Sequence, residues 1–232
     1  MTAQPAPAYF VAGTDTEIGK TFVSCALIQR AAQHGLRAGG LKPIAAGTDA
    51  AGRNEDVEQL LAASNTALPL DLVNRYRFRA AVAPHIAARD ENIAIHFPAI
   101  AADLAQARGQ SDFLIVEGVG GFRVPLGVDR DGRPQDSADL AQALGLPLVF
   151  VVGMRLGCIN HCLLSIEAIQ ARGLNLAGWV ANRVDPEMSR FDDNLHTLQS
   201  LLPAPLLGCI PHAPAGGAAG AARHLRLPGE RI

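Results

Sequence analysis

Apolar residues along this chain gather into short uninterrupted runs and into longer segments with helical spacing. The runs at 113–116 and 148–152 show no polar alternation, which is typical of strands buried on both faces of a parallel sheet. Less uniform apolar runs predict further strands at 9–12, 36–41, 176–180 and 206–210.

Segments in which apolar residues recur every three or four positions follow most of these runs and predict helices. They cover 21–34, 55–64, 97–108, 159–172 and 190–202. Asn54 is the expected N-cap of the second helix, and Gly35 and Gly173 stand where the first and fourth should end. The alternation predicts an α/β fold, a doubly wound, mostly parallel sheet flanked by helices in a single domain. Such sheets bind ligands in the loops after their strands.

Segments outside this alternation are assigned less regular structure. Residues 1–8 are expected to form a flexible N-terminus ahead of one domain at 9–232. Arginines alternate with aromatic residues over 75–79, which suits an edge strand. Residues 213–222, rich in Gly and Ala, are expected to be poorly ordered. The loop at 128–135, rich in Asp and Arg, is either a solvated connection or a loop that closes over a ligand.

Composition favours a folded protein and narrows its partners. Hydrophobic residues make up 49% and charged residues 18% of the chain, enough apolar material for a substantial core. The net charge of −2 comes without long single-sign blocks, so no nucleic-acid partner is expected. Residues 1–8 contain no Lys or Arg, and the longest apolar run, at 146–152, is too short to cross a bilayer. We therefore expect a cytoplasmic protein with no membrane partner.

Four cysteines, at Cys25, Cys158, Cys162 and Cys209, are too few and too scattered to suggest a disulfide framework. Cys158 and Cys162 are four residues apart and could share a helical face with His161, as some zinc ligands do. Without a second ligand cluster, buried thiols explain the pair better, and no histidine is assigned to a metal.

The strongest chemical signal lies between the first predicted strand and the first predicted helix. It reads Gly13-Thr14-Asp15-Thr16-Glu17-Ile18-Gly19-Lys20-Thr21. Backbone N–H groups at a helix start cradle phosphate oxygens, Gly19 permits close approach, Lys20 neutralises charge and the Thr21 hydroxyl suits Mg²⁺. Five residues separate Gly13 from Gly19, one more than in the usual loop. Either Thr14 takes the first glycine position or the loop is one residue longer.

Three further residues stand where strand ends should meet this loop. Asp56 opens the second predicted helix and Glu117 follows the run at 113–116 directly. One or two carboxylates are what Mg²⁺ usually takes from a protein, although Asp56 also suits a helix start and Glu117 begins a glycine-rich turn. Lys42 ends the strand at 36–41, where it either stabilises a transferring phosphoryl group or is a solvated strand-end lysine.

Taken together, these stretches resemble the dethiobiotin synthetase family over most of residues 9–213. The matching segments are 9–21, Lys42-Pro43, Val116-Glu117-Gly118-Val119-Gly120-Gly121, Leu156-Gly157-Cys158-Ile159-Asn160-His161, Leu176-Ala177-Gly178-Trp179-Val180-Ala181-Asn182 and Pro203-Ala204-Pro205-Leu206-Leu207-Gly208.

The resemblance implies a homodimer with a phosphate-loop α/β fold. Such an enzyme uses ATP, Mg²⁺, CO₂ (or bicarbonate) and 7,8-diaminopelargonic acid in biotin biosynthesis. One amine of the substrate captures CO₂ as a carbamate, ATP phosphorylates the carbamate to a carbamic-phosphoric anhydride, and the second amine closes the ring. The products are dethiobiotin, ADP and phosphate.

The same resemblance implies a role for each matching residue. Lys20 and Lys42 would be the catalytic residues, and Thr21, Asp56 and Glu117 would hold Mg²⁺. The implied ATP-binding residues are Glu17, Ile18, Gly19, Lys20, Thr21, Phe22, Asp56, Glu117, Gly118, Val119, Gly120, Asn182, Arg183, Pro211, His212 and Ala213. The implied substrate-binding residues are Thr16, Lys42, Ala46, Leu156, Gly157, Cys158 and Asn160, the last four in the site of the partner subunit.

Two departures from the family pattern bear on the substrate. Ala46 stands where a substrate-contacting Ser is common, so one hydrogen bond worth about 0.5–1.5 kcal/mol is either lost or made by Thr48 or a water instead. Arg155 replaces a frequent Lys and keeps its charge. The segment after Ala213 follows no family pattern.

Two other classes share parts of this signal. A P-loop ATPase switch of the partitioning and cell-division type would usually carry another lysine near the start of the loop, and residues 13–18 contain none. An amidotransferase synthetase of the cobyrinic type would need a glutaminase domain, for which the chain has no room.

Overall fold

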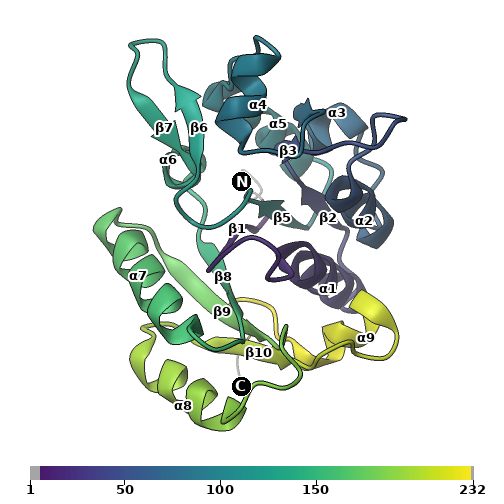
Figure 1. The fold of residues 1–232 in the computed structure, drawn as a ribbon. Helices are drawn as coiled ribbons and strands as arrows, with labels where there is room; N and C mark the ends of the chain where they lie inside the picture. The colour runs from purple at the N-terminus through teal and green to yellow at the C-terminus, as the bar shows by residue number, and fades with distance from the viewer. Residues whose placement is uncertain (1–5, 231–232) are drawn as a thin grey trace.

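A six-stranded parallel sheet forms the centre of the protein (Figure 1). The computed structural model describes residues 6–230. The strands lie in the order β10-β9-β8-β1-β5-β2. Their bounds are β1 (Ala8–Gly13), β2 (Ala38–Leu41), β5 (Phe113–Glu117), β8 (Leu148–Gly153), β9 (Leu176–Asn182) and β10 (Leu206–Ile210). The order reverses beside β1, which confirms the predicted doubly wound sheet and puts the ligand crevice at the end of β1.

Alternate residues of the central strands face opposite layers of helices. Phe10, Val116 and Phe150 belong to one hydrophobic cluster, whereas Val11 and Ile115 belong to the other, as the two-residue period of a strand requires. On the first face lie α5 (Phe97–Arg108), α6 (Ser137–Leu144), α7 (Cys158–Ala171) and α8 (Phe191–Leu201); on the second lie α1 (Lys20–Gln33), α2 (Glu55–Ala63) and α9 (Gly217–Ala221). Burial on both faces explains the lack of polar alternation at 113–116 and 148–152.

Two small sheets and three short helices lie outside the predicted elements. β3 (Ile44–Ala46) pairs in parallel with β4 (Tyr76–Phe78), so the expected edge strand at 75–79 joins a separate two-stranded sheet. β6 (Pro125–Val128) and β7 (Pro134–Asp136) form an antiparallel hairpin. The expected loop at 128–135 therefore includes strand residues at both ends, and the turn itself is 129–133. The short helices are α3 (Leu70–Val73), α4 (Pro84–Asp90) and the 3₁₀ turn η1 (Ala222–His224), and α6 was not predicted either.

The expectation of a poorly ordered segment at 213–222 is wrong. This segment forms α9 and the start of η1, and Gly220 and Ala221 are buried against α1. Ala218 and Ala221 pack in the hydrophobic cluster that contains α1. Gly220 is needed within the segment itself, because a β-carbon there would lie 1.8 Å from Ala215 O. The chain then returns to the sheet, where Arg226 N–H donates to Leu207 O at 2.8 Å.

The N-terminal boundary also differs slightly from the prediction. Strand β1 begins at Ala8, which is buried, so this residue belongs to the sheet. Most of the expected flexible N-terminus, residues 1–5, lies outside the described residues. Across residues 6–230, no helix combines the length and the hydropathy needed to cross a membrane.

Candidate active site

The phosphate loop joins β1 to α1, and its backbone conformation leaves no room for a side chain at several positions. Gly19 has φ 78° and directly precedes Lys20, the first residue of α1. A β-carbon on Gly19 would lie 2.3 Å from Asn182 Nδ2, and one on Gly13 would lie 2.6 Å from the Ile18 side chain. Glu17 also adopts a positive φ, 58°, an unusual conformation for a residue with a side chain. The loop is therefore tightly folded, with its N–H groups at the start of a 14-residue helix.

Side chains from neighbouring strand ends hold this loop in place. Asn182, the last residue of β9, donates from Nδ2 to Ile18 O at 2.8 Å. At the end of β8, Gly153 N–H donates to Thr14 Oγ1 at 3.3 Å, and further along Arg155 pairs with Asp15 at 2.6 Å. The loop is thus fixed to β8 and β9 as well as to the strand it follows.

Lys42 lies at the centre of the charged part of the site. Its Nζ is 2.6 Å from Glu117 Oε1 and 2.9 Å from Asp56 Oδ2. The Thr21 hydroxyl donates to the same Glu117 oxygen at 2.7 Å. These residues come from the ends of β2 and β5 and from the first turns of α2 and α1. The structure therefore brings together three residues that the sequence could only place separately, and Lys42, 4% exposed at its side chain, is not a solvated strand-end lysine.

The charges of this cluster oppose the effect of burial. Burial by itself would lower the pKa of Lys42, but Glu117 and Asp56 outweigh it and raise that pKa. Burial would raise the pKa of Asp56, and Lys42 reverses this and lowers it. The pKa of Lys20 falls to about 8 because it is buried and lies near Lys42. Two lysines thus belong to one site. Lys42 has a raised pKa and stays a cation, whereas Lys20 has a lowered pKa and loses its proton more easily.

The residues present fit a magnesium ion. Glu117 Oε2 is buried and has no hydrogen-bond partner among residues 6–230, an arrangement that costs free energy unless a ligand is bound there. Thr21, Asp56 and Glu117 offer a hydroxyl and two carboxylates, and oxygen ligands of this kind and number suit Mg²⁺, which keeps waters and phosphate oxygens as its other ligands. Within residues 6–230, no group of three or more His, Cys, Asp and Glu side chains could hold a metal.

A cavity of about 820 Å³ opens over this cluster and joins it to an apolar wall. Twelve predicted residues line it: Thr16, Glu17, Gly19, Lys20, Thr21, Phe22, Lys42, Ala46, Asp56, Glu117, Val119 and Gly120. The cavity lining also includes apolar residues that the sequence did not predict, namely Ala45, Ala81, Val82, Ala83, Pro84 and Val124. Together they form the apolar wall. Residues 81–84 could have been found from Pro84, because proline is common at the first position of a helix. It marks where the preceding loop ends and a short helix begins.

The remaining predicted residues lie outside this cavity. Beside the phosphate loop, Arg183 N–H donates to Ile210 O at 3.0 Å and His212 Nδ1 lies 3.3 Å from Arg183 O, so the residues expected around adenine are neighbours. The Ile18 side chain is fully buried beneath Gly13 and Gly153.

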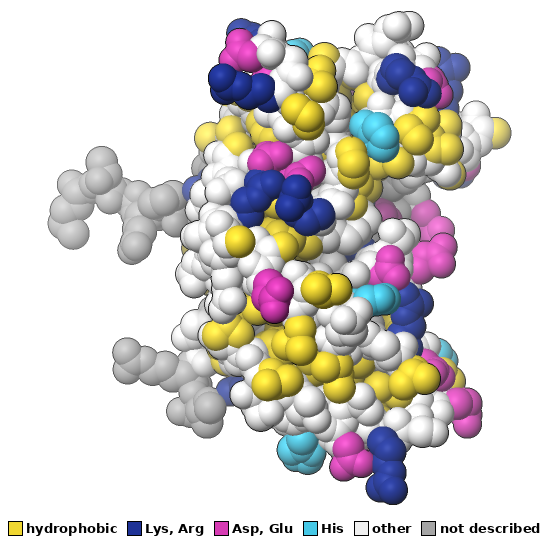
Figure 2. Space-filling model, turned by 60° about the vertical axis from the view of Figure 1, so that its left-hand side comes forward, with side chains coloured by type: hydrophobic (Ala, Val, Ile, Leu, Met, Phe, Trp, Pro, Cys, Tyr) yellow, Lys and Arg dark blue, Asp and Glu magenta, His cyan; other side chains and the backbone are white. Residues whose placement is uncertain are grey.

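The loop before α7 faces away from the cavity of its own chain. Leu156 is 91% exposed and Gly157 has φ 93°, whereas the Cys158 side chain is buried. Leu164 on the same helix is 58% exposed. Figure 2, which brings the α7 side of the molecule forward, shows hydrophobic side chains gathered over the lower part of that face. The four thiols of the described chain are unpaired, and burial raises the pKa of Cys162 to about 12, in line with buried, inert thiols.

The fold and the loop together define a P-loop nucleoside-triphosphate-binding protein. The cell division protein MinD of Aquifex aeolicus shares the fold with a TM-score of 0.57 at 16% identity, over 98% of this chain and 99% of that one. Cobyrinic acid a,c-diamide synthase of Mycobacterium smegmatis, solved with an ATP analogue and magnesium, shares it with a TM-score of 0.55 at 15% identity, over 94% and 92%. At these identities the likeness concerns the fold alone.

Sequence relatives are far closer and specify the family. Residues 7–219 match the AAA domain family. The ATP-dependent dethiobiotin synthetase BioD of Aromatoleum aromaticum is 56% identical over 225 residues, which are 96% of this chain and 98% of that protein. The chain belongs to the family of ATP-dependent dethiobiotin synthetases, which confirms the resemblance seen in its motifs.

Replacing Gly19 by Ala tests the phosphate loop. The new β-carbon would collide with Asn182 Nδ2 at 2.3 Å and disfavour φ 78°, so we expect the Kd of a non-hydrolysable ATP analogue to rise at least about tenfold. Gly52→Ala is the matched control, because Gly52 has φ 75° with nothing within 4 Å of its β-carbon position. Calorimetric titration measures both, and equal Kd values for the two variants would contradict the assigned loop.

Proposed function

We propose that this protein carboxylates 7,8-diaminopelargonic acid and closes its ureido ring, which forms dethiobiotin and consumes ATP. The proposed enzyme depends on Mg²⁺ and acts in the cytoplasm, where ATP is available. The observation that carries the proposal is one cavity that holds a phosphate loop, a buried lysine between two carboxylates, and an apolar wall. The first suits ATP, the second an anionic intermediate, and the third the alkyl chain of a diamino acid.

The proposed reaction has three steps. A neutral amine attacks CO₂ and loses a proton, which leaves a carbamate. A carbamate oxygen attacks the γ-phosphorus of ATP, and the bond to ADP breaks, giving a carbamic-phosphoric anhydride. The second amine then attacks the carbonyl carbon, phosphate departs with the bonding electron pair, and a second proton is lost as the ring closes.

Lys42 and Lys20 support these steps by their positive charge. Nearby cations disfavour protonation of the attacking amines and stabilise the carbamate and the transferring phosphoryl group. Lys42 is held ready by Glu117 and Asp56. Lys20 donates to the Asp15 carbonyl at 2.6 Å, and charged phosphate oxygens are stronger acceptors than this carbonyl, so nucleotide binding favours a turn of Lys20 toward them.

Thr21, Asp56 and Glu117 would hold Mg²⁺, which when bound neutralises charge on the β- and γ-phosphates. With an ion held by these carboxylates, Lys42 would keep only part of its present contacts, and its ammonium would be available to pair with the carbamate.

The substrate chain is assigned to the apolar wall. Ala46 contributes no hydroxyl there, so an interaction of about 0.5–1.5 kcal/mol is missing compared with a serine at this position. We expect this to weaken substrate binding without preventing turnover.

The proposed enzyme is a homodimer in which Leu156, Gly157, Cys158 and Asn160 of one chain complete the site of the other. Support comes from the exposed apolar residues of this loop and of α7, and from the backbone N–H groups at the start of this 14-residue helix, which suit the substrate carboxylate. Sedimentation velocity should show twice the mass of one chain. Leu164→Asp should give monomers while Leu201→Asp, at a residue 51% exposed on α8, should not; a monomeric parent protein would refute the dimer.

The test of the reaction is dethiobiotin formation from ATP, Mg²⁺, bicarbonate and diaminopelargonic acid. Product should appear with one phosphate released per molecule, and neither should appear without the diamine. Phosphate release that ignores the diamine and yields no dethiobiotin would sink the proposal and favour an ATPase switch.

Lys42→Met removes the central ammonium and keeps the side-chain length. We expect turnover to fall by about 100-fold or more, while binding of a non-hydrolysable ATP analogue remains measurable because the phosphate loop is intact. The variant also leaves Glu117 without its cation, so circular dichroism must first show a folded protein. Arg37→Met, at the opposite end of β2 where Arg37 pairs with Asp112 on the surface, should keep near-normal turnover.

A further inference from the structure

The segment 118–124 connects Glu117 to the β6–β7 hairpin and forms one wall of the cavity. Val119, Gly120 and Val124 line the cavity. The wall is closely packed, because a β-carbon on Gly120 would lie 2.8 Å from Val124 Cγ2 and one on Gly118 would lie 3.1 Å from the Phe10 ring. A small shift of this segment therefore changes the shape of the cavity beside Glu117.

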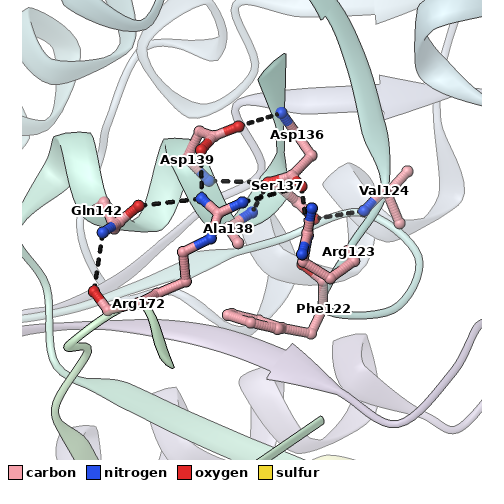
Figure 3. A network of polar contacts seen from close by, with 9 residues as sticks. All are labelled: Phe122, Arg123, Val124, Asp136, Ser137, Ala138, Asp139, Gln142 and Arg172. Atoms are coloured by element: carbon pink, nitrogen blue, oxygen red, sulfur yellow. Dashed lines mark hydrogen bonds and ion pairs between the residues drawn. The ribbon is translucent and has the colours of Figure 1, made fainter. Parts of the chain in front are cut away.

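Ser137 holds the far end of this wall. Its hydroxyl donates to Phe122 O at 2.6 Å and accepts from Val124 N–H at 3.0 Å, while Ser137 N–H donates to Val124 O at 2.9 Å (Figure 3). Ser137 is 2% exposed and Phe122 4%, so water cannot replace these bonds without rearrangement. Among residues 6–230, Ser137 supplies the only side-chain hydrogen bonds to the backbone of 118–124.

Neighbouring charges keep Ser137 in its position at the start of α6. Asp136 caps this helix by accepting from Ala138 N–H at 2.9 Å, and Asp139 accepts from Asp136 N–H at 2.7 Å. Arg123 from the wall and Arg172 from the end of α7 both pair with Asp136 (Figure 3). The wall is thereby connected through Asp136 to the helix whose opposite end carries Gly157 and Cys158.

Ser137 bonds the hairpin end of this wall, whereas the other end of the wall lies beside the phosphate loop. A β-carbon on Gly121 would lie 3.8 Å from Gly13 O, and one on Gly120 would lie 3.7 Å from Thr16 Oγ1. Among residues 6–230, no hydrogen bond or ion pair joins Ser137, Asp136 or Arg172 to Lys20, Thr21, Lys42, Asp56 or Glu117. The phosphate loop has its own supports at Asn182 and Gly153. A change in Ser137 should therefore displace Val124, at the hairpin end of the wall, more than Val119 and Gly120, which the family resemblance assigns to ATP.

We propose that Ser137 is a positioning residue for the diamine substrate, acting through the backbone of Phe122 and Val124. The inference rests on the proposed dethiobiotin-forming reaction. A serine that only stabilised the fold would change the amount of active enzyme, whereas a positioning residue changes the KM for the substrate whose wall it holds.

Ser137→Ala is the decisive variant, with Ser200→Ala as control, because the Ser200 hydroxyl also bonds one backbone carbonyl, at 2.8 Å, but on exposed α8. We expect the KM for diaminopelargonic acid to rise about fivefold, with kcat per folded enzyme within twofold of the parent and the KM for ATP changing less. Ser137→Thr retains the hydroxyl and should restore most of the diamine KM. An unchanged diamine KM in Ser137→Ala would overturn the proposal.

Hydrogen exchange of the segment 118–124 provides a readout without turnover. Loss of the Ser137 hydroxyl should speed exchange at Val124 N–H, and unchanged exchange would also overturn the proposal. If the parent enzyme forms no dethiobiotin, the proposed function has failed, and exchange still decides whether Ser137 holds the wall. Should Ser137→Ala not fold, Arg123→Gln tests the same wall from its exposed side, where a diamine KM equal to that of the parent would refute the role.

Discussion

The ammonium of Lys42 between the carboxylates of Glu117 and Asp56 is the interaction on which the rest of the site depends. Lys42 and Glu117 are almost completely buried, at 4% and 0% side-chain exposure. Removing one partner of such a pair costs about 3–5 kcal/mol, because the other charge stays buried without compensation. The pair therefore requires β2 and β5 to be neighbours in register and α2 to begin beside them, and the parallel sheet supplies both conditions.

The cavity is divided into a charged floor and an apolar wall, and the two come from different kinds of structure. Lys20, Lys42 and Glu117 stand at the ends of buried elements, where neighbouring strands leave little freedom. Val82 and Val124 stand on segments outside the central sheet, held by short helices, hairpins and side-chain hydrogen bonds such as those of Ser137. Rigid positioning suits the groups that stabilise charge, while the wall sets which substrate chain fits.

Sequence reasoning succeeded where a local pattern had one physical explanation. The unalternating runs at 113–116 and 148–152 could hardly be anything but central strands, and Asn54 caps α2 as expected, accepting from Val57 N–H. It failed where short elements depend on distant partners. The start of α6 is capped by Asp136 and Asp139, a weaker signal than the usual serine and glutamate pair. Gly220 lies so close to the Ala215 carbonyl that no β-carbon would fit there, and no local sequence pattern distinguishes such a glycine from one in a disordered segment.

By itself the sequence determined the class of fold, the phosphate loop and the family. The apolar runs predict the class of fold, the Gly19-Lys20-Thr21 motif predicts the phosphate loop, and sequence similarity to relatives identifies the family. Only the tertiary structure decided that Lys42 contacts both Glu117 and Asp56, that Asn182 supports the loop at Ile18, and that 81–84 and Val124 line the same cavity as these charges. These contacts join residues up to 164 positions apart. Their distances follow from the order and register of the strands. Sequence periodicity predicts that strands are present but does not predict which strands are neighbours or how they are aligned.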